Sequence, residues 1–147
     1  MPDKEVVERA QKDKREGKSA STQAGEFVRE EIEHIREGKH GARSAKQAIA
    51  IGLSKARRAG VELPPPEKGT TSEETREQAV RELSKAKKPA KKTSVKRSRA
   101  MSRVLKREGT SAASKLALSR HARSAAAKRS AVARSRSAKK AAKTRKK

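Results

Sequence analysis

Large apolar side chains limit this chain's fold more than any other feature, because they are few and gathered in one stretch. Val, Ile, Leu, Met and Phe together number 21 of 147 residues, and Phe27 is the sole aromatic residue. Leu, Ile, Val and Phe alone make about 13% of the chain, below the roughly 20% under which a highly charged chain is expected to be disordered. Nine large apolar residues lie between positions 21 and 63. We therefore expect a small core there and little folding elsewhere.

Charge is distributed just as unevenly. Residues 1–63 carry 14 basic and 11 acidic side chains, whereas residues 85–147 carry 24 basic side chains and a single acidic one, Glu108. The whole chain has a formal net charge of +24. A nearly neutral front half is thus followed by a polycation, and such a charge predicts a polyanionic partner.

Several classes of protein are not expected from this composition. The chain has no Cys, so neither disulfides nor thiolate metal sites can form. The first twenty residues contain no apolar segment typical of a secretory signal, and no stretch approaches the 18 apolar residues of a membrane span. We therefore expect a soluble, cytoplasmic protein with no membrane partner.

Two helices are predicted around the apolar stretch. In the first, Val28, Ile32 and Ile35 recur at i, i+4 and i+7 with Phe27 beside them, which places them on one helix face. Gly38 then ends that helix in the manner of a C-terminal glycine cap.

The second helix begins after Ser44, which with Gln47 forms a capping box. Ile49 and Leu53 define its large apolar face, and the run Pro64-Pro65-Pro66 forbids continuation. The two helices should pack as a hairpin of about residues 22–60. The predicted core residues are Phe27, Val28, Ile32, Ile35, Ile49 and Leu53.

The predicted fold is all-α: this hairpin, further isolated helices, and a largely disordered Lys/Arg/Ala/Ser-rich C-terminal tail. In the N-terminal segment, Val6, Val7 and Ala10 offer only one weak helical stripe. The predicted segments are a charged lead-in (1–21), the hairpin module (22–63), a Pro-rich linker (64–71), an amphipathic helix (72–88) and a basic low-complexity tail (89–147).

The tail is the predicted nucleic-acid-binding region. One-signed charge at this density exceeds what solubility requires, and its spacing along a helix suits a phosphate backbone. The lack of aromatic residues disfavours base stacking, so we expect sequence-nonspecific binding to double-stranded DNA. The candidate DNA-binding residues are Lys87, Lys88, Lys91, Lys92, Lys96, Arg97, Arg99, Arg103, Lys106, Arg107, Lys115, Arg120, Arg123, Lys128, Arg129, Arg134, Arg136, Lys139, Lys140, Lys143 and Arg145.

Two resemblances point the same way. The module EFVREEIEHIREGKHGARSAKQAIAIGLSKARRAG, within residues 19–60, resembles a family of small uncharacterised bacterial basic proteins, some of them labelled DNA-binding. The tail, with KKPAKK and SAKKAAKTRKK, resembles the C-terminal regions of linker histones and bacterial histone-like proteins. These resemblances imply a histone-like, nucleoid-associated DNA-binding protein.

Other functions remain open at this point. An RNA- or ribosome-associated basic protein would use the same polycation, because DNA and RNA helices both present a regular array of phosphates. Alternatively, the helical module is an adaptor for a protein partner. Nine large apolar residues are few for independent stability, and two helices cannot bury all of Phe27, Ile51 and Leu63. Self-association or a protein partner through residues 22–63 is therefore also expected.

Neither a metal site nor catalysis is expected. Zinc requires three or four ligands, and the helix that carries His34 offers no second His, while His40 lies in the turn between Gly38 and Gly41. No spacing of Ser, His and carboxylate suggests a catalytic unit. We therefore expect no enzyme activity, no cofactor and no metal.

Overall fold

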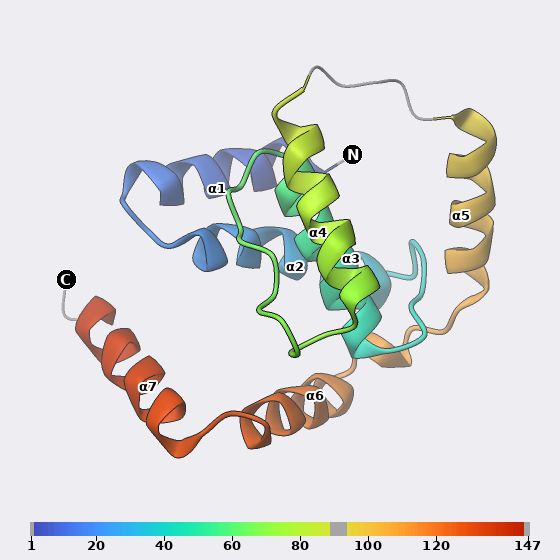
Figure 1. Ribbon diagram of the computed structural model, residues 1–147. Coiled ribbons are helices and arrows are strands. Elements are labelled where there is room, and N and C mark those ends of the chain that lie inside the picture. Colours follow the sequence, from blue (N-terminus) through green and yellow to red (C-terminus); the bar gives the residue numbers. More distant parts are fainter. Residues whose placement is uncertain (1, 89–93, 146–147) are drawn as a thin grey trace.

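The computed structural model describes residues 2–88 and 94–145 of the chain. Within these ranges its helices and turns are accompanied by no β-strand, and only an isolated bridge joins Lys68 and Thr71. The all-α prediction is confirmed (Figure 1). The elements are α1 (Lys4–Arg15), α2 (Ala20–Arg36), α3 (Ala45–Arg58), α4 (Glu73–Ala86), α5 (Val95–Arg107), the 3-10 turn η1 (Ser111–Ala113), α6 (Lys115–Ala127) and α7 (Ala131–Arg145).

Helices α2 and α3 form the central pair, and local sequence signals set their ends. The Ser44 side chain accepts a hydrogen bond from the Gln47 amide at the start of α3, which satisfies one of the free donors of the first turn. Gly38 adopts φ +72° just beyond α2, a conformation that glycine reaches without steric cost. The chain can therefore reverse there and lay α3 against α2.

A stripe of small residues allows these two helices to approach closely. Ala48, Gly52 and Ala56 recur at every fourth position of α3 and are buried. A Cβ atom built at Gly52 would lie 2.6 Å from Val28 Cα, so the backbones touch at this point. The packing face of α3 is consequently its small-residue face.

The large residues of α3 lie beside that face instead. Ile49 is half-buried and belongs to neither apolar cluster, which corrects its prediction as a core residue. Leu53 and Val28 are also half-buried, and each packs at the margin of a cluster. The reason is steric: a stripe of Ile and Leu would hold the helices farther apart than the Gly52 contact allows.

The first apolar cluster surrounds Phe27, which is 1% exposed. Val6 and Ala10 of α1 cover the ring from one side, and Ala56 and Val61 enclose it from α3 and the segment that follows. The N-terminal segment is therefore a packed helix for most of its length rather than only a charged lead-in.

The second apolar cluster surrounds Ile32 and Ile35 of α2. Ala48 of α3 contributes one wall, and Ala112 and Ala113 of η1 contribute another. A short segment of the basic tail thus completes the core of the module. The surfaces left open by two helices alone are covered by α1, Val61 and η1, although self-association itself stays a prediction.

Helix α4 packs on α3 and is not isolated. Ala79 is buried in this interface, and Glu82, only 5% exposed, accepts a hydrogen bond from Ser54. Arg57 and Arg58 place guanidinium nitrogens 3.7 Å from the same carboxylate. The buried charge is therefore paired, as buried carboxylates must be.

The prediction of a disordered tail is wrong for residues 95–145, which form α5, η1, α6 and α7. Sparse apolar residues prevent a core but do not prevent a helix, and alanine, arginine and lysine are strong helix formers. Serine caps start two of these helices: Ser114 accepts from the Ala117 amide, and Ser130 accepts from the Ala133 amide. Helices α5 and α7 stand apart from the α1–α4 group on opposite sides of it (Figure 1).

The loop between α2 and α3 fastens the tail to the module. The Gly41 amide donates to the Leu105 carbonyl at 2.8 Å, and the Ala42 amide donates to the Gly109 carbonyl at 3.1 Å. Arg36 Nε donates to the Ala113 carbonyl at 2.9 Å. These three bonds hold the C-terminal end of α5 and the turn η1 against the end of α2.

Gly41→Ala is expected to break this attachment. A Cβ at Gly41 would overlap the Glu108 carbonyl, whereas a Cβ at Gly109 would meet only Ser111 Oγ at 4.0 Å. We expect Gly41→Ala to speed hydrogen exchange at residues 41–42 and 112–113 by at least about tenfold, equivalent to about 1.4 kcal/mol of local stability. Gly109→Ala is the matched control and should leave these rates within about twofold. Equal rates in the two variants would contradict the attachment.

No helix in the described part of the chain is both long and apolar enough to cross a membrane.

Candidate nucleic-acid interface

The predicted DNA-binding cations all lie on the surface wherever the structure describes them. Helices α5, α6 and α7 have no buried residue. Lys91 and Lys92 lie outside the described residues. The exposed members of the predicted set are Lys87, Lys88, Lys96, Arg97, Arg99, Arg103, Lys106, Arg107, Lys115, Arg120, Arg123, Lys128, Arg129, Arg134, Arg136, Lys139, Lys140, Lys143 and Arg145.

Carboxylate partners distinguish the tail from the module, which in the structure comprises α1–α4 rather than the hairpin alone. Between residues 94 and 145, as described, no Lys or Arg forms an ion pair, and Glu108 pairs with Arg43 of the module. In the module, by contrast, Arg9 lies 2.7 Å from Glu26 and Arg81 lies 3.0 Å from Glu77. The module neutralises much of its own charge, whereas the tail has no means of doing so.

Ion pairing also shifts the pKa values of charged side chains in the module. The hydrogen bond to Glu26 raises the pKa of Arg9. The hydrogen bond to Glu37 raises the pKa of Lys39, and its counterpart lowers the pKa of Glu37. These groups are ionised partners of one another at neutral pH.

Helix α5 carries five of its six cations on one face. From Lys96 these five recur at i, i+3, i+7, i+10 and i+11, a spacing that spans an arc of about 100° at 3.6 residues per turn. Arg97, Met101 and Val104 lie on the other side. The residues of this cationic face are Lys96, Arg99, Arg103, Lys106 and Arg107.

Helix α7 carries its cations more broadly. Arg136, Lys139, Lys140 and Lys143 fall within about 100° of arc, while Arg134 and Arg145 lie toward the other side. Its only large apolar residue, Val132, is 68% exposed. The helix therefore presents positive charge in most directions.

An open hollow of about 500 Å³ lies between the tail and the module. It lies where the first turns of α3 and α6 meet, and both turns carry free amide donors. Its basic lining residues are Arg43, Lys46, Arg120 and His121. The lining is positive from both the tail and the module.

The sequence pattern did not predict that residues of the module line this hollow. Arg43 and Lys46 lie in the nearly neutral front half, so counting charge by segment gave them no weight. The available signal was the pair of serine caps, Ser44 and Ser114, which predict two helix starts but not that these starts meet. Their meeting depends on the contacts of η1 with α2 and α3.

One comparison with known proteins gives a match. Residues 13–68 match the model of a family described as a family of unknown function, DUF6496. The matched region runs from the end of α1 through α2 and α3 to the segment before α4, and it excludes the basic tail. It supports the predicted likeness to an uncharacterised family and carries no activity with it. No curated protein and no solved structure matches the chain.

Proposed function

We propose that this protein binds duplex DNA through the phosphate backbone, using the cations of α5, α6 and α7 without preference for sequence. The absence of carboxylate partners for these cations, within described residues 94–145, carries the proposal. A cation paired inside the protein must give up its partner before it binds phosphate, whereas an exposed, unpaired cation releases only counterions from the DNA. Such binding makes the protein a histone-like component of the nucleoid.

The spacing of charge along α7 supports this partner. Six cations occupy its 15 residues, which span about 22 Å at 1.5 Å per residue. This gives one cation per roughly 3.7 Å of axis, close to the 3.4 Å between phosphates along one DNA strand. Four of these cations, at positions 136, 139, 140 and 143, share one face, so α7 can lie along a backbone with that face toward the phosphates.

The side chains of the tail favour phosphate contacts over base recognition. Residues 94–145 contain no Asn, Gln, Phe, Tyr or Trp. Asn and Gln read adenine edges, and aromatic rings stack on unpaired bases. Arg and Lys with interspersed Ser suit contacts to phosphate and sugar, which position a protein without specifying sequence.

The salt dependence of binding tests the proposal. If ten cations neutralise phosphates, log K should fall against log salt with a slope of about −9 on duplex DNA. Fluorescence anisotropy with random-sequence duplexes between 50 and 300 mM salt, roughly, measures this slope. A slope shallower than about −3, or a hundredfold preference for one duplex sequence, would contradict phosphate-dominated binding.

Binding to an RNA duplex of equal length distinguishes DNA from RNA as the preferred polyanion. DNA binding is expected to be at least as tight as RNA binding. In cell extracts, DNase rather than RNase treatment should release the protein from its nucleic-acid complexes. The opposite pattern in both measurements would assign the tail to RNA.

A further inference from the structure

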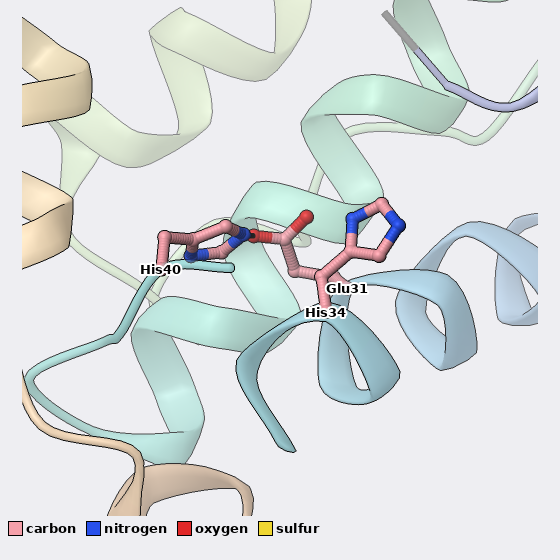
Figure 2. Close-up of side chains that lie close together, drawn as sticks. All are labelled: Glu31, His34 and His40. Atoms are coloured by element: carbon pink, nitrogen blue, oxygen red, sulfur yellow. Dashed lines mark ion pairs between the residues drawn. The ribbon is translucent and has the colours of Figure 1, made fainter. Parts of the chain in front are cut away.

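Glu31, His34 and His40 come together at the end of α2 (Figure 2). Glu31 and His34 are three residues apart on α2, and His40 comes from the loop that turns toward α3. One ligand atom of each residue lies within 4.8 Å of the other two. In Figure 2 the Glu31 carboxylate lies between the two imidazole rings.

The Glu31 carboxylate is deeply buried and incompletely satisfied. Its side chain is 1% exposed, and neither oxygen has a hydrogen bond of acceptable geometry. Lys55 Nζ lies 2.7 Å from Oε2, and His40 Nε2 lies 3.1 Å from Oε1, but neither is aligned as a donor. A buried carboxylate in this condition is costly, so its position favours an additional cationic partner.

His40 is held in the orientation typical of a metal ligand. Its Nδ1 lies 3.1 Å from the Gly41 carbonyl, and in the neutral ring Nδ1–H donates to that oxygen. Nε2 then faces Glu31 and is the ring nitrogen available to an ion. Metal-bound histidines almost always donate their other N–H in this way, often to a backbone carbonyl.

The surrounding charges leave the cluster negative. Glu30, 3% exposed, adds a second buried carboxylate, and Asp3 Oδ2 lies 3.6 Å from His34 Nε2. Among the described residues, Lys55 is the single ammonium group in contact with the two glutamates. Three carboxylates therefore lie near one described ammonium group and two imidazoles, and a divalent cation would offset this negative charge.

We propose that Glu31, His34 and His40 bind a divalent transition-metal ion, with Zn²⁺ as the best match. Two imidazoles and one carboxylate are a recognised zinc ligand set that leaves a fourth position for water. Ligand atoms around tetrahedral zinc lie roughly 3.4 Å apart, given bonds of about 2.0–2.1 Å. The 3.1 Å between Glu31 and His40 is already close to this spacing, and His34 closes the set by a small side-chain movement.

Such a site would depart from the prediction that no metal site is expected. That prediction considered only histidines on one helix, whereas the second imidazole comes from the loop that follows. The flanking glycines, Gly38 and Gly41, allow the loop to fold back over α2: Gly38 adopts φ +72°, and Gly41 packs against the Glu108 backbone.

Equilibrium dialysis of the full chain against Zn²⁺, in the absence of nucleic acid, tests the site. We expect one ion per chain. His34→Gln and His40→Gln should each weaken binding by about 100-fold or more, because loss of an outer partner alone costs about 10–100-fold. His121→Gln removes a histidine outside the cluster and should bind as the native chain does. Circular dichroism checks that each variant stays helical.

The variant Lys55→Met distinguishes a metal site from a cluster with a purely structural role. The ammonium of Lys55 competes with the metal for Glu31, so its removal should tighten Zn²⁺ binding by on the order of tenfold while lowering the melting temperature of the metal-free chain. Co²⁺ in place of Zn²⁺ should give the visible spectrum of a tetrahedral N/O site.

Three results would overturn the proposal. They are the absence of stoichiometric Zn²⁺ binding, equal weakening by His121→Gln and His40→Gln, and weaker binding by Lys55→Met. Because every arm is measured without DNA, these outcomes are independent of the proposed nucleic-acid binding.

Discussion

Glutamine at five cations of α7 is expected to weaken duplex DNA binding on the order of 10⁴-fold at 0.1 M salt. Each lost phosphate contact removes about 0.9 from the salt slope, and therefore about 0.9 decades of affinity at that concentration. Glutamine is nearly as good a helix former as lysine or arginine, so α7 should persist. The variant changes Arg134, Arg136, Lys139, Lys140 and Lys143.

A charge-matched variant of the module is the control. It removes the same five positive charges from exposed side chains that already face carboxylates, so the net charge of the chain falls equally. We expect its DNA affinity to change less than about tenfold. It replaces Lys12, Arg29, Lys39, Arg76 and Arg81, which pair with Glu16, Glu33, Glu37, Glu73 and Glu77.

Titration of one labelled duplex with both variants provides the comparison. If the two variants lose affinity equally, net charge alone controls binding and the unpaired cations of the tail have no special role. If only the module variant loses affinity, the interface has been assigned to the wrong half of the chain.

Gly52→Leu is expected to destabilise the module by about 3 kcal/mol or more, enough to unfold much of it. The new Cβ would lie 2.6 Å from Val28 Cα, and backbone atoms cannot yield as a flexible side chain can. Overpacking of this kind forces whole elements apart. Urea denaturation followed by circular dichroism measures the loss.

Gly25→Leu is the matched control, because it makes the same substitution in the paired helix. A Cβ at Gly25 meets nothing within 4 Å, and replacing a helical glycine with a good helix former stabilises by about 0.5–1 kcal/mol. The two variants should therefore change stability in opposite directions. Equal destabilisation would mean that α3 does not pack on α2 through its small-residue stripe.

The helices were predictable where the signals are local. The caps at Ser44 and Gly38 depend on hydrogen bonds and dihedral angles within one turn, and they appear at the predicted positions. The apolar face of α2 was equally readable, because Phe27, Ile32 and Ile35 are large and all three are buried.

The packing face of α3 could not be read from size alone. Its sequence offers both a large stripe through Ile49 and a small stripe through Gly52, and either has helical spacing. The close approach of α2 and α3 favours the small-residue stripe. That approach is a property of the helix pair and cannot be derived from either helix alone. The partners of Phe27 and Ile35, Val6 and Ala113 respectively, are also distant in sequence, so no local pattern predicts them.

The tail helices and the meeting of Glu31, His34 and His40 were not predicted from the sequence, for different reasons. Composition predicted disorder because it measures the capacity to form a core, whereas α7 requires only helix propensity and serine caps. The cluster depends on a loop that brings His40 back to Glu31, and no periodicity describes a loop. The cations of the tail, in contrast, were found from charge counts alone.

Lysine footprinting on the DNA-bound protein tests the central claim most directly. Brief acetylation of the full chain, with and without random duplex DNA, reports which ammonium groups lie against phosphates. We expect at least about fivefold protection at Lys96, Lys106, Lys139, Lys140 and Lys143, and less than about twofold at Lys12 and Lys14 of α1. Protection of the α1 lysines with unchanged reactivity along α5 and α7 would contradict the account.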